Sequence, residues 1–182
     1  PGAKPGGRSI DPLPYDGPDS VGEGTGGRLL FRPRRRRIPI YLASMGPKSV
    51  SLAYEVADGY IPMFFSPEKE SIFFDGVDTH DRVDDVSLAP LVPVAIGSDV
   101  SQCRNRVKVG LAFFLGAMGT RKHNFYNRFF QRLGYEREAE VIRDFYSAGH
   151  RMAAAMAVPD RFVDEVALCG PPERVAERLD AW

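Results

Sequence analysis

The segment that decides the fold is IPIYLASMGPKSVSLAYEVADGYIPMFFS, which occupies residues 38–66. Two continuous apolar runs flank a stretch of helical period, in which Val50, Ala53 and Ala57 share one stripe. Apolar runs without polar alternation are typical of parallel strands buried on both faces. The segment therefore predicts a strand–turn–helix–strand unit, with strands over residues 38–44 and 60–65.

The turn after the first strand contains Gly46 and Pro47. We expect Gly46 to permit a sharp exit from the strand and Pro47 to take the first helical position, where its missing N–H costs nothing. The free backbone amides of Met45, Lys48 and Ser49 would then face outward at the carboxyl end of the strand. Unpaired amides and the helix dipole both favour negative charge, so the turn predicts an anion site.

The rest of the chain continues this alternation of strand and helix. A third strand is predicted over residues 91–96 and a helix over residues 100–115, a cadence typical of a (β/α)8 barrel. Residues 1–33 are rich in glycine and proline without periodicity, which predicts an irregular connecting loop over residues 1–37 and a folded region over residues 38–182. From residue 124 onward the pattern predicts helices almost throughout, with Gly134 and Gly149 just past helix ends.

Several blocks follow one another in a distinctive order. They are IPIYLAS, MGPKSV, EVADGY and MFFSPE, then PLVPVAIGSDVSQCRNRV, GAMGTRKHNFYNRFFQRLGYEREA and AVPDRFVDEVALCGPPERVAERL. In this order they resemble the luciferase-like monooxygenase superfamily, and within it the coenzyme F420-dependent oxidoreductase branch that is methylenetetrahydromethanopterin reductase-like. The resemblance covers about residues 27–182. A Gly-Pro turn alone would be a weak signal, so the order of the blocks carries the specificity.

The resemblance implies an α/β fold that is part of a (β/α)8 TIM barrel, with strands five to seven and the C-terminal helices, truncated at both ends. It implies an oxidoreductase that transfers a hydride between coenzyme F420 and an organic substrate, acting on CH–NH or CH–OH donors. Two alternatives stay open: an FMN-dependent monooxygenase or reductase, and a noncatalytic barrel remnant. The loops that hold the cofactor ring in the family follow the early strands, so we expect this fragment to be inactive alone and the longer parent to be a homodimer.

The resemblance also assigns candidate cofactor-binding residues, all at the predicted carboxyl ends of strands. No catalytic residue and no metal ligand is assigned. Met45 stands where small residues are common in the family, which would narrow the approach to a phosphate, and Lys48 would add a point charge. The candidates are Ala43, Ser44, Met45, Gly46, Lys48, Met63 and Phe64. For Met63 and Phe64 the competing interpretation is barrel core.

Composition excludes several other classes of protein. Lys plus Arg and Asp plus Glu each number 24, so no net field favours nucleic acid or an anionic membrane. The run Arg32-Pro33-Arg34-Arg35-Arg36-Arg37 is a rival nucleic-acid-binding signal, but it lacks interleaved aromatic residues and predicts a solvated loop. Cys103 and Cys169 lack CxxC spacing and predict reduced thiols, which favours a cytoplasmic protein.

Other residues that look chemical have structural explanations. Asp99 or Ser98 is expected to cap the helix that follows. A helix of about 16 residues spans about 24 Å, so the block that contains His123 and Asn124 is expected at the opposite barrel face, where residues usually serve stability. Asn124 would cap the next helix, and Gly116 and Gly119 would end the previous one.

Overall fold

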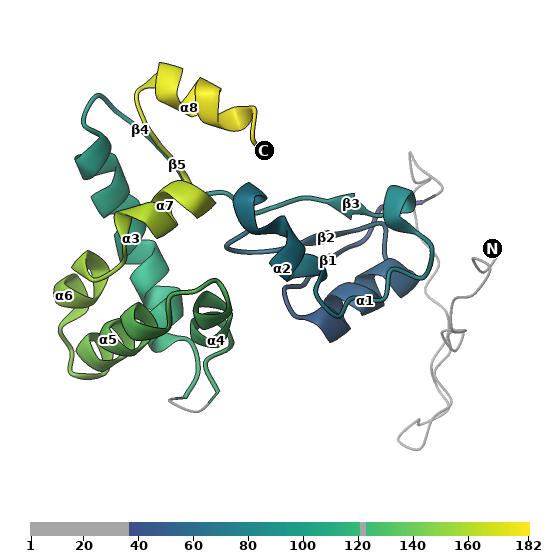
Figure 1. Ribbon diagram of the computed structural model, residues 1–182, viewed down its shortest axis with the longest axis horizontal. Helices are drawn as coiled ribbons and strands as arrows, with labels where there is room; N and C mark the ends of the chain where they lie inside the picture. Colours follow the sequence, from purple (N-terminus) through teal and green to yellow (C-terminus); the bar gives the residue numbers. More distant parts are fainter. Residues whose placement is uncertain (1–36, 121–122) are drawn as a thin grey trace, which may run out of the picture.

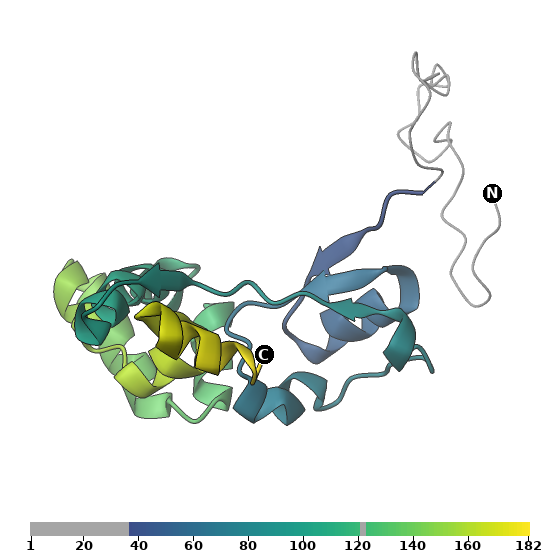
Figure 2. The same cartoon turned by 90° about the horizontal axis from the view of Figure 1, so that it is seen from above.

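The structure is a computed structural model, and it describes residues 37–120 and 123–182. The connecting loop predicted for residues 1–37 therefore lies, except for Arg37, outside the described residues. Two groups of elements are visible: a parallel sheet with one long helix against it, and an assembly of helices further along the chain (Figure 1). Figure 2 shows extended chain running from one group to the other.

The predicted strand–turn–helix–strand unit is present. Strand β1 (Tyr41–Ala43) leads into helix α1 (Pro47–Val56), which returns to strand β2 (Gly59–Ile61). Strand β3 (Ser87–Leu88) adds to the other side of β2, and all three strands are parallel. Between β2 and β3 lie the short helices η1 (Pro67–Lys69), α2 (Glu70–Phe74) and η2 (Val83–Asp85). The predicted stripe of α1 faces this sheet, with Val50, Ala53 and Ala57 fully buried beside Tyr60.

The strands are not buried on both faces, so that prediction was wrong. Tyr41 and Ile61 are 40% and 38% exposed, while their neighbours Leu42 and Tyr60 belong to the core under α1. Helix α1 covers one face of the sheet, and no element among residues 37–120 and 123–182 covers the other. The continuous apolar sequence therefore includes side chains on the sheet face opposite α1, and these side chains are exposed in the described chain.

The third predicted strand differs from the prediction in length and in partner. Strand β3 precedes residues 91–96, Leu91 forms an isolated parallel bridge to Met63, and only β4 (Val94–Ile96) falls inside the predicted range. Strand β4 pairs in parallel with β5 (Leu168–Gly170), which the sequence did not predict. A three-residue strand has almost no periodicity of its own, and its pairing partner lies more than 70 residues away, so local pattern cannot reveal it.

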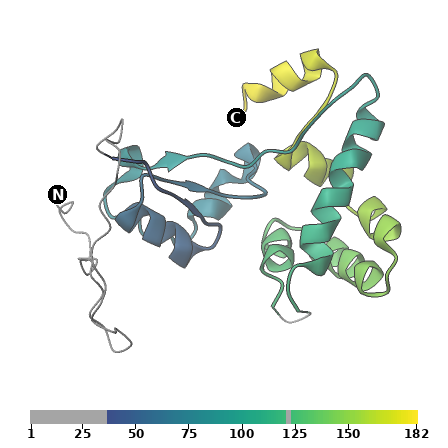
Figure 3. The ribbon, with the colours of Figure 1, turned by 180° about the vertical axis from the view of Figure 1, so that it is seen from behind.

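The helices form the second group around α3 (Val100–Ala117). They are α4 (Phe125–Arg132), α5 (Glu136–Ser147), α6 (Arg151–Met156), α7 (Asp160–Val166) and α8 (Pro172–Leu179). Figure 3 shows α5 and α6 along one side of α3, and α4 on the other. Leu115, Phe130, Ile142 and Phe162 are fully buried at their centre.

Local signals for helix ends were mostly read correctly. The Asp99 carboxylate accepts a hydrogen bond from the Gln102 amide at 3.0 Å, and Asn124 caps α4 through the Asn127 amide at 2.9 Å. Gly134 and Gly149 have φ of 90° and 81°, as glycines after a helix end do. Gly116 was predicted wrongly, because it lies inside α3, where a Cβ would come within 2.5 Å of the Tyr146 Cβ. It is a close-packing position between α3 and α5.

Candidate functional site

The carboxyl ends of β1 and β2 lie side by side and form the edge on which the candidate residues sit. Ala43 is in register with Ile61, and the Ser44 amide donates to the Ile61 carbonyl at 3.4 Å. Parallel pairing therefore brings residues 43–46 next to residues 62–64, as the sequence predicted. In α/β proteins this edge is where ligands bind.

Two hydroxyls fix the shape of the turn between β1 and α1. The Ser44 hydroxyl, which is buried, donates to the Ser49 carbonyl at 3.1 Å, and the Ser49 hydroxyl donates to the Gly46 carbonyl at 2.9 Å. Gly46 is the N-cap of α1 and Pro47 follows at the first helical position, as expected; no side chain among residues 37–120 and 123–182 caps this helix. The amides of the first turn are thus left for an acceptor from outside the turn.

Gly46 does not have the conformational role predicted for it. Its φ of −93° and ψ of 153° are extended values that any residue adopts, so the sharp exit from β1 does not need glycine. A Cβ at Gly46 would meet only the Phe125 ring at 3.5 Å and the Ser49 hydroxyl at 3.9 Å, which are ordinary contacts. Nothing within the described chain requires the bare backbone, whereas close approach of a ligand to the turn would require it.

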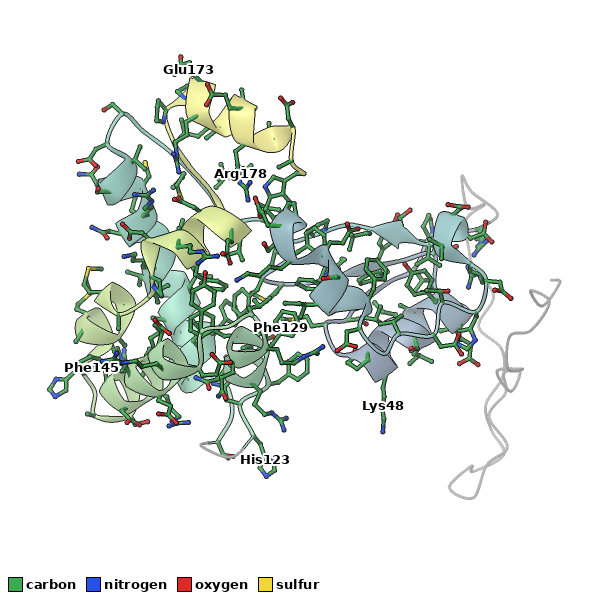
Figure 4. The ribbon with its side chains drawn as sticks, in the orientation of Figure 1. Lys48, His123, Phe129, Phe145, Glu173 and Arg178 are labelled. Atoms are coloured by element: carbon green, nitrogen blue, oxygen red, sulfur yellow. The ribbon has the colours of Figure 1, made fainter. Side chains whose placement is uncertain are left out.

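Met45 and Lys48 point in different directions from this turn. Met45 is 6% exposed and belongs to the main hydrophobic core, so its side chain does not narrow the approach to the amides. Lys48 is exposed, and Figure 4 shows its side chain extending from the end of α1 away from the body of the molecule. It forms no ion pair with any residue in the described ranges. The turn therefore combines uncapped amides with one unpaired cation.

Met63 and Phe64, at the end of β2, differ in what they present to solvent. The ring of Phe64 is 3% exposed and is enclosed by Phe114, Tyr126 and Phe162 at centroid distances of 5.6–6.3 Å. Its backbone has a φ of 58°, a left-handed value that costs a non-glycine residue on the order of 1 kcal/mol. Met63 is half-buried and lines a cavity of about 360 Å³. Only Met63 of the pair offers side-chain surface to a ligand.

The start of α4 lies at the same edge, and the sequence did not predict this. The Phe125 ring lies 3.5 Å from the position that a Cβ at Gly46 would take, and the Tyr126 ring lies 5.9 Å from the Phe64 ring. We expected this block at the opposite face of the barrel, and that prediction was wrong.

The reason is an offset between the strand pairs. Leu88 is level with Tyr60, and Ile96 lies eight residues further on, which is about 26 Å of extended chain. Helix α3, with 18 residues, then returns about 27 Å and stops level with the ends of β1 and β2. The position of α4 depends on the pairing of β4 with β5 outside the first sheet, and no local sequence pattern indicates this pairing.

The other residues that looked chemical lie away from this edge or are used in structure. His123 is exposed in the loop before α4 and points outward in Figure 4. The Asp99 carboxylate caps α3. Both cysteines are buried free thiols, and burial raises the pKa of the Cys169 thiol to about 11, so it is not a nucleophile near neutral pH.

A second cavity, of about 610 Å³, is lined by charged residues at the junction of η1, α7 and α8. Its charges are used in pairing: Lys69 with Glu165 at 2.8 Å, Arg178 with Glu68, and Asp164 with Arg104. Lys69 also donates to the Leu133 carbonyl at 2.7 Å. The network holds the helices to the segment after β2, and we assign it a structural role.

The described residues offer neither a metal site nor a membrane-spanning helix. Between residues 37–120 and 123–182 no group of three or more His, Cys, Asp or Glu side chains is arranged to hold a metal ion. Within the same ranges no helix combines the length and apolar character needed to cross a membrane. Of the predicted basic run, residues 32–36 lie outside the described residues, and Arg37 pairs with Asp58.

Comparison with known proteins places these features in a family. A coenzyme F420-dependent oxidoreductase, so named, of Mycobacterium tuberculosis is 28% identical over 177 residues, which is 93% of this chain and 51% of that protein. The 5,10-methylenetetrahydromethanopterin reductase of Archaeoglobus fulgidus is 26% identical over 180 residues, 91% of this chain and 50% of that protein. The chain thus spans about half the length of the curated relatives it matches.

Among solved structures, the coenzyme F420-dependent tetrahydromethanopterin reductase of Methanopyrus kandleri superposes with a TM-score of 0.63. The match has 19% sequence identity and covers 79% of this chain and 41% of the other. This likeness confirms the predicted fold class, part of a luciferase-like α/β barrel. The family model for luciferase-like monooxygenases matches residues 12–182. The chain therefore belongs to the luciferase-like monooxygenase family.

Proposed function

We propose that this chain is part of an oxidoreductase that binds coenzyme F420 and transfers a hydride between this cofactor and a small organic substrate, at a CH–NH or CH–OH donor. Support comes from two relatives whose names contain coenzyme F420 and from a methylenetetrahydromethanopterin reductase. The single structural observation that carries the proposal is the turn at the N-terminus of α1, which has uncapped amides and a glycine that the described chain does not need.

The residues of this turn fit an anionic cofactor tail. Coenzyme F420 carries a phosphodiester and an acidic oligoglutamate tail, whereas FMN ends in one compact phosphate. The amides of the first turn of α1 would receive the phosphodiester, and Gly46 leaves room for its oxygens. Lys48, exposed one residue beyond Pro47, would meet the acidic tail.

The chemistry of hydride transfer is supplied by the deazaflavin ring when it is bound. The residues of this chain would bind and orient. Ser44 and Ser49 hold the turn in one shape through their hydrogen bonds, and Met63 offers an apolar surface on the neighbouring strand. Fixing the tail at a rigid turn lowers the entropy cost of holding the ring in place.

The test is a titration of the full chain with coenzyme F420 and with FMN at matched ionic strength, followed by cofactor fluorescence. We expect tighter binding of coenzyme F420, and we expect Lys48→Ala to weaken it by about 1 kcal/mol, roughly fivefold, with a smaller effect on FMN. Arg137→Ala is the matched control, because Arg137 is an exposed cation at the same position of α5, the second residue of the helix.

Two results would count against the proposal. Tighter binding of FMN than of coenzyme F420 would move the protein to the flavin branch of the family. A coenzyme F420 affinity that falls equally in Lys48→Ala and Arg137→Ala would show only a loss of general positive charge.

A further inference from the structure

A cavity of about 360 Å³ separates the segment between β3 and β4 from helix α3. Its walls are apolar except at one place. Residues of the strand side are Met63, Leu91, Val92 and Pro93, and those of the helix side are Arg106, Val107, Gly110, Leu111 and Phe114. The volume lies at the lower end of the range of about 300–1,000 Å³ that small-molecule sites occupy.

Gly110 opens the helix wall of this cavity. It lies in the interior of α3, where glycine is less favourable than alanine. A Cβ at this position would meet no heavy atom of the described residues within 4 Å, so packing against this part of the chain does not explain the glycine. Gly116 in the same helix is the contrast, because a Cβ there would collide with Tyr146 at 2.5 Å. The bare surface at Gly110 therefore faces space that an external group can fill.

Of the described residues that line the cavity, only Arg106 is charged. Helix α3 has two other basic residues, and both are neutralised by carboxylates of α7: Arg104 by Asp164 at 2.5 Å, and Lys108 by Asp160 at 2.5 Å. Arg106 is exposed, donates to the Gln102 side chain at 3.2 Å, and forms no ion pair with a residue of the described chain. A guanidinium with free donors beside an apolar wall suits a carboxylate, which it can bind through two hydrogen bonds.

We propose that this cavity binds a small molecule with an apolar, ring-sized body and one carboxylate group. The body lies between Met63, Leu91 and Phe114 over the bare surface of Gly110, and the carboxylate pairs with Arg106 at the rim. This site shares Met63 with the proposed cofactor site, but it involves neither the amides of the turn at α1 nor Lys48. It therefore goes beyond the proposed cofactor function, and either can fail without the other.

The probe is 2-naphthoate, titrated into the full chain without cofactor and followed by naphthalene fluorescence and by calorimetry. We expect saturable binding at one site, and binding at least tenfold weaker for the neutral analogue 2-naphthalenemethanol. Arg106→Gln should weaken 2-naphthoate binding by at least tenfold and leave the alcohol unaffected. Gly110→Leu should abolish binding of both compounds without lowering the melting temperature, because leucine fills open space and favours helix.

Val109→Ala is the control, since Val109 neighbours Gly110 on α3 but does not line the cavity. It should leave both affinities unchanged. The absence of saturable binding would overturn the proposal, and so would equal affinity for acid and alcohol. An affinity for 2-naphthoate that Arg106→Gln leaves unchanged would also overturn it, and this exposed substitution decides the matter even if Gly110→Leu fails to fold.

Discussion

The helical region and the strand region of this chain differ in how they bury apolar side chains. The helices around α3 pack against one another, and Leu115, Phe130, Ile142 and Phe162 at their centre have no exposed surface. Strands β1 and β2 bury one face under α1 and leave Tyr41 and Ile61 exposed on the other, and Val94 and Ile96 of β4 are more than half exposed. The difference indicates that cohesion is concentrated in the helices.

The features that suggest binding lie with the strands. The uncapped amides of α1, the unneeded glycine at Gly46 and the left-handed backbone of Phe64 all stand at strand ends. Helix α3 lines the cavity beside Leu91 with Gly110, while Leu111 and Leu115 of the same helix are buried. Regions with unpaired groups and open surface are those where proteins place ligand contacts, whereas a closed core mainly supplies stability.

The first and largest test of this comparison is the removal of a ring from the helical core. Phe162 lies within 4.6–5.6 Å of the rings of Phe130, Tyr135 and Phe64. Phe162→Ala should lower the free energy of unfolding by about 3–5 kcal/mol, because it removes buried apolar surface and leaves a cavity. Urea denaturation followed by circular dichroism measures the change.

Phe145→Ala is the matched control in the same region. Phe145 is 39% exposed on the outer side of α5, as Figure 4 shows. Its loss should cost less than about 1 kcal/mol. Similar losses for the two variants would mean that the helical region is not a closed core, and the contrast with the strand region would fail.

The part of this structure that sequence predicted is the part specified by neighbouring residues. The Gly-Pro turn places the start of α1, Asp99 and Asn124 cap their helices, and Gly134 and Gly149 end theirs. In each case the residue that sets the helix end lies within a few positions of that end. The pairing of β1 with β2 followed for the same reason, since a single helix connects them.

The part that sequence did not predict depends on partners far along the chain. Strand β5 pairs with β4, which lies more than 70 residues earlier in the chain, and three residues carry too little pattern to reveal this pairing. The offset between the two strand pairs determines where α3 ends. It therefore also determines that Phe125 and Tyr126 lie beside Gly46 and Phe64. Because this one pairing was not predicted, the contribution of α4 to the candidate site was not predicted either.

The second prediction concerns one of the contacts that join the two regions, the pair formed by Glu68 and Arg178. Glu68, just after β2, accepts hydrogen bonds from the Arg178 guanidinium of α8, one of them at 2.8 Å. Arg178 lowers the pKa of Glu68 from 4.5 to about 2 in the folded protein. A lowered pKa stabilises the fold above the unfolded value, so this contribution is complete above about pH 5 and is lost as the pH falls from about 4.5 to 2.

Glu68→Gln should therefore lower the free energy of unfolding by about 1 kcal/mol at neutral pH, a value kept small because Glu68 is 47% exposed and screened by solvent. The difference from wild type should shrink to near zero at pH 2, as measured by urea denaturation across this range. Glu140→Gln serves as the control, because Glu140 is exposed on α5 and forms no ion pair with a described residue. A difference between wild type and Glu68→Gln that does not change with pH would show that Arg178 does not hold the two regions together.

The last prediction has the smallest expected effect on stability and bears most directly on the strand region. Gly46→Val should change the free energy of unfolding by only about 0.5 kcal/mol, because the φ of −93° suits valine and a Cβ there makes ordinary contacts with the half-exposed Phe125 ring and the Ser49 hydroxyl. The same substitution should weaken coenzyme F420 binding at least tenfold, since its methyl groups would stand over the amides of the first turn of α1. Gly46→Ala should fall between wild type and valine in affinity while matching both in melting temperature. If stability and affinity instead fall together through this series, Gly46 has only a structural role. The carboxyl ends of β1 and β2 would then no longer be supported as the binding side of the molecule.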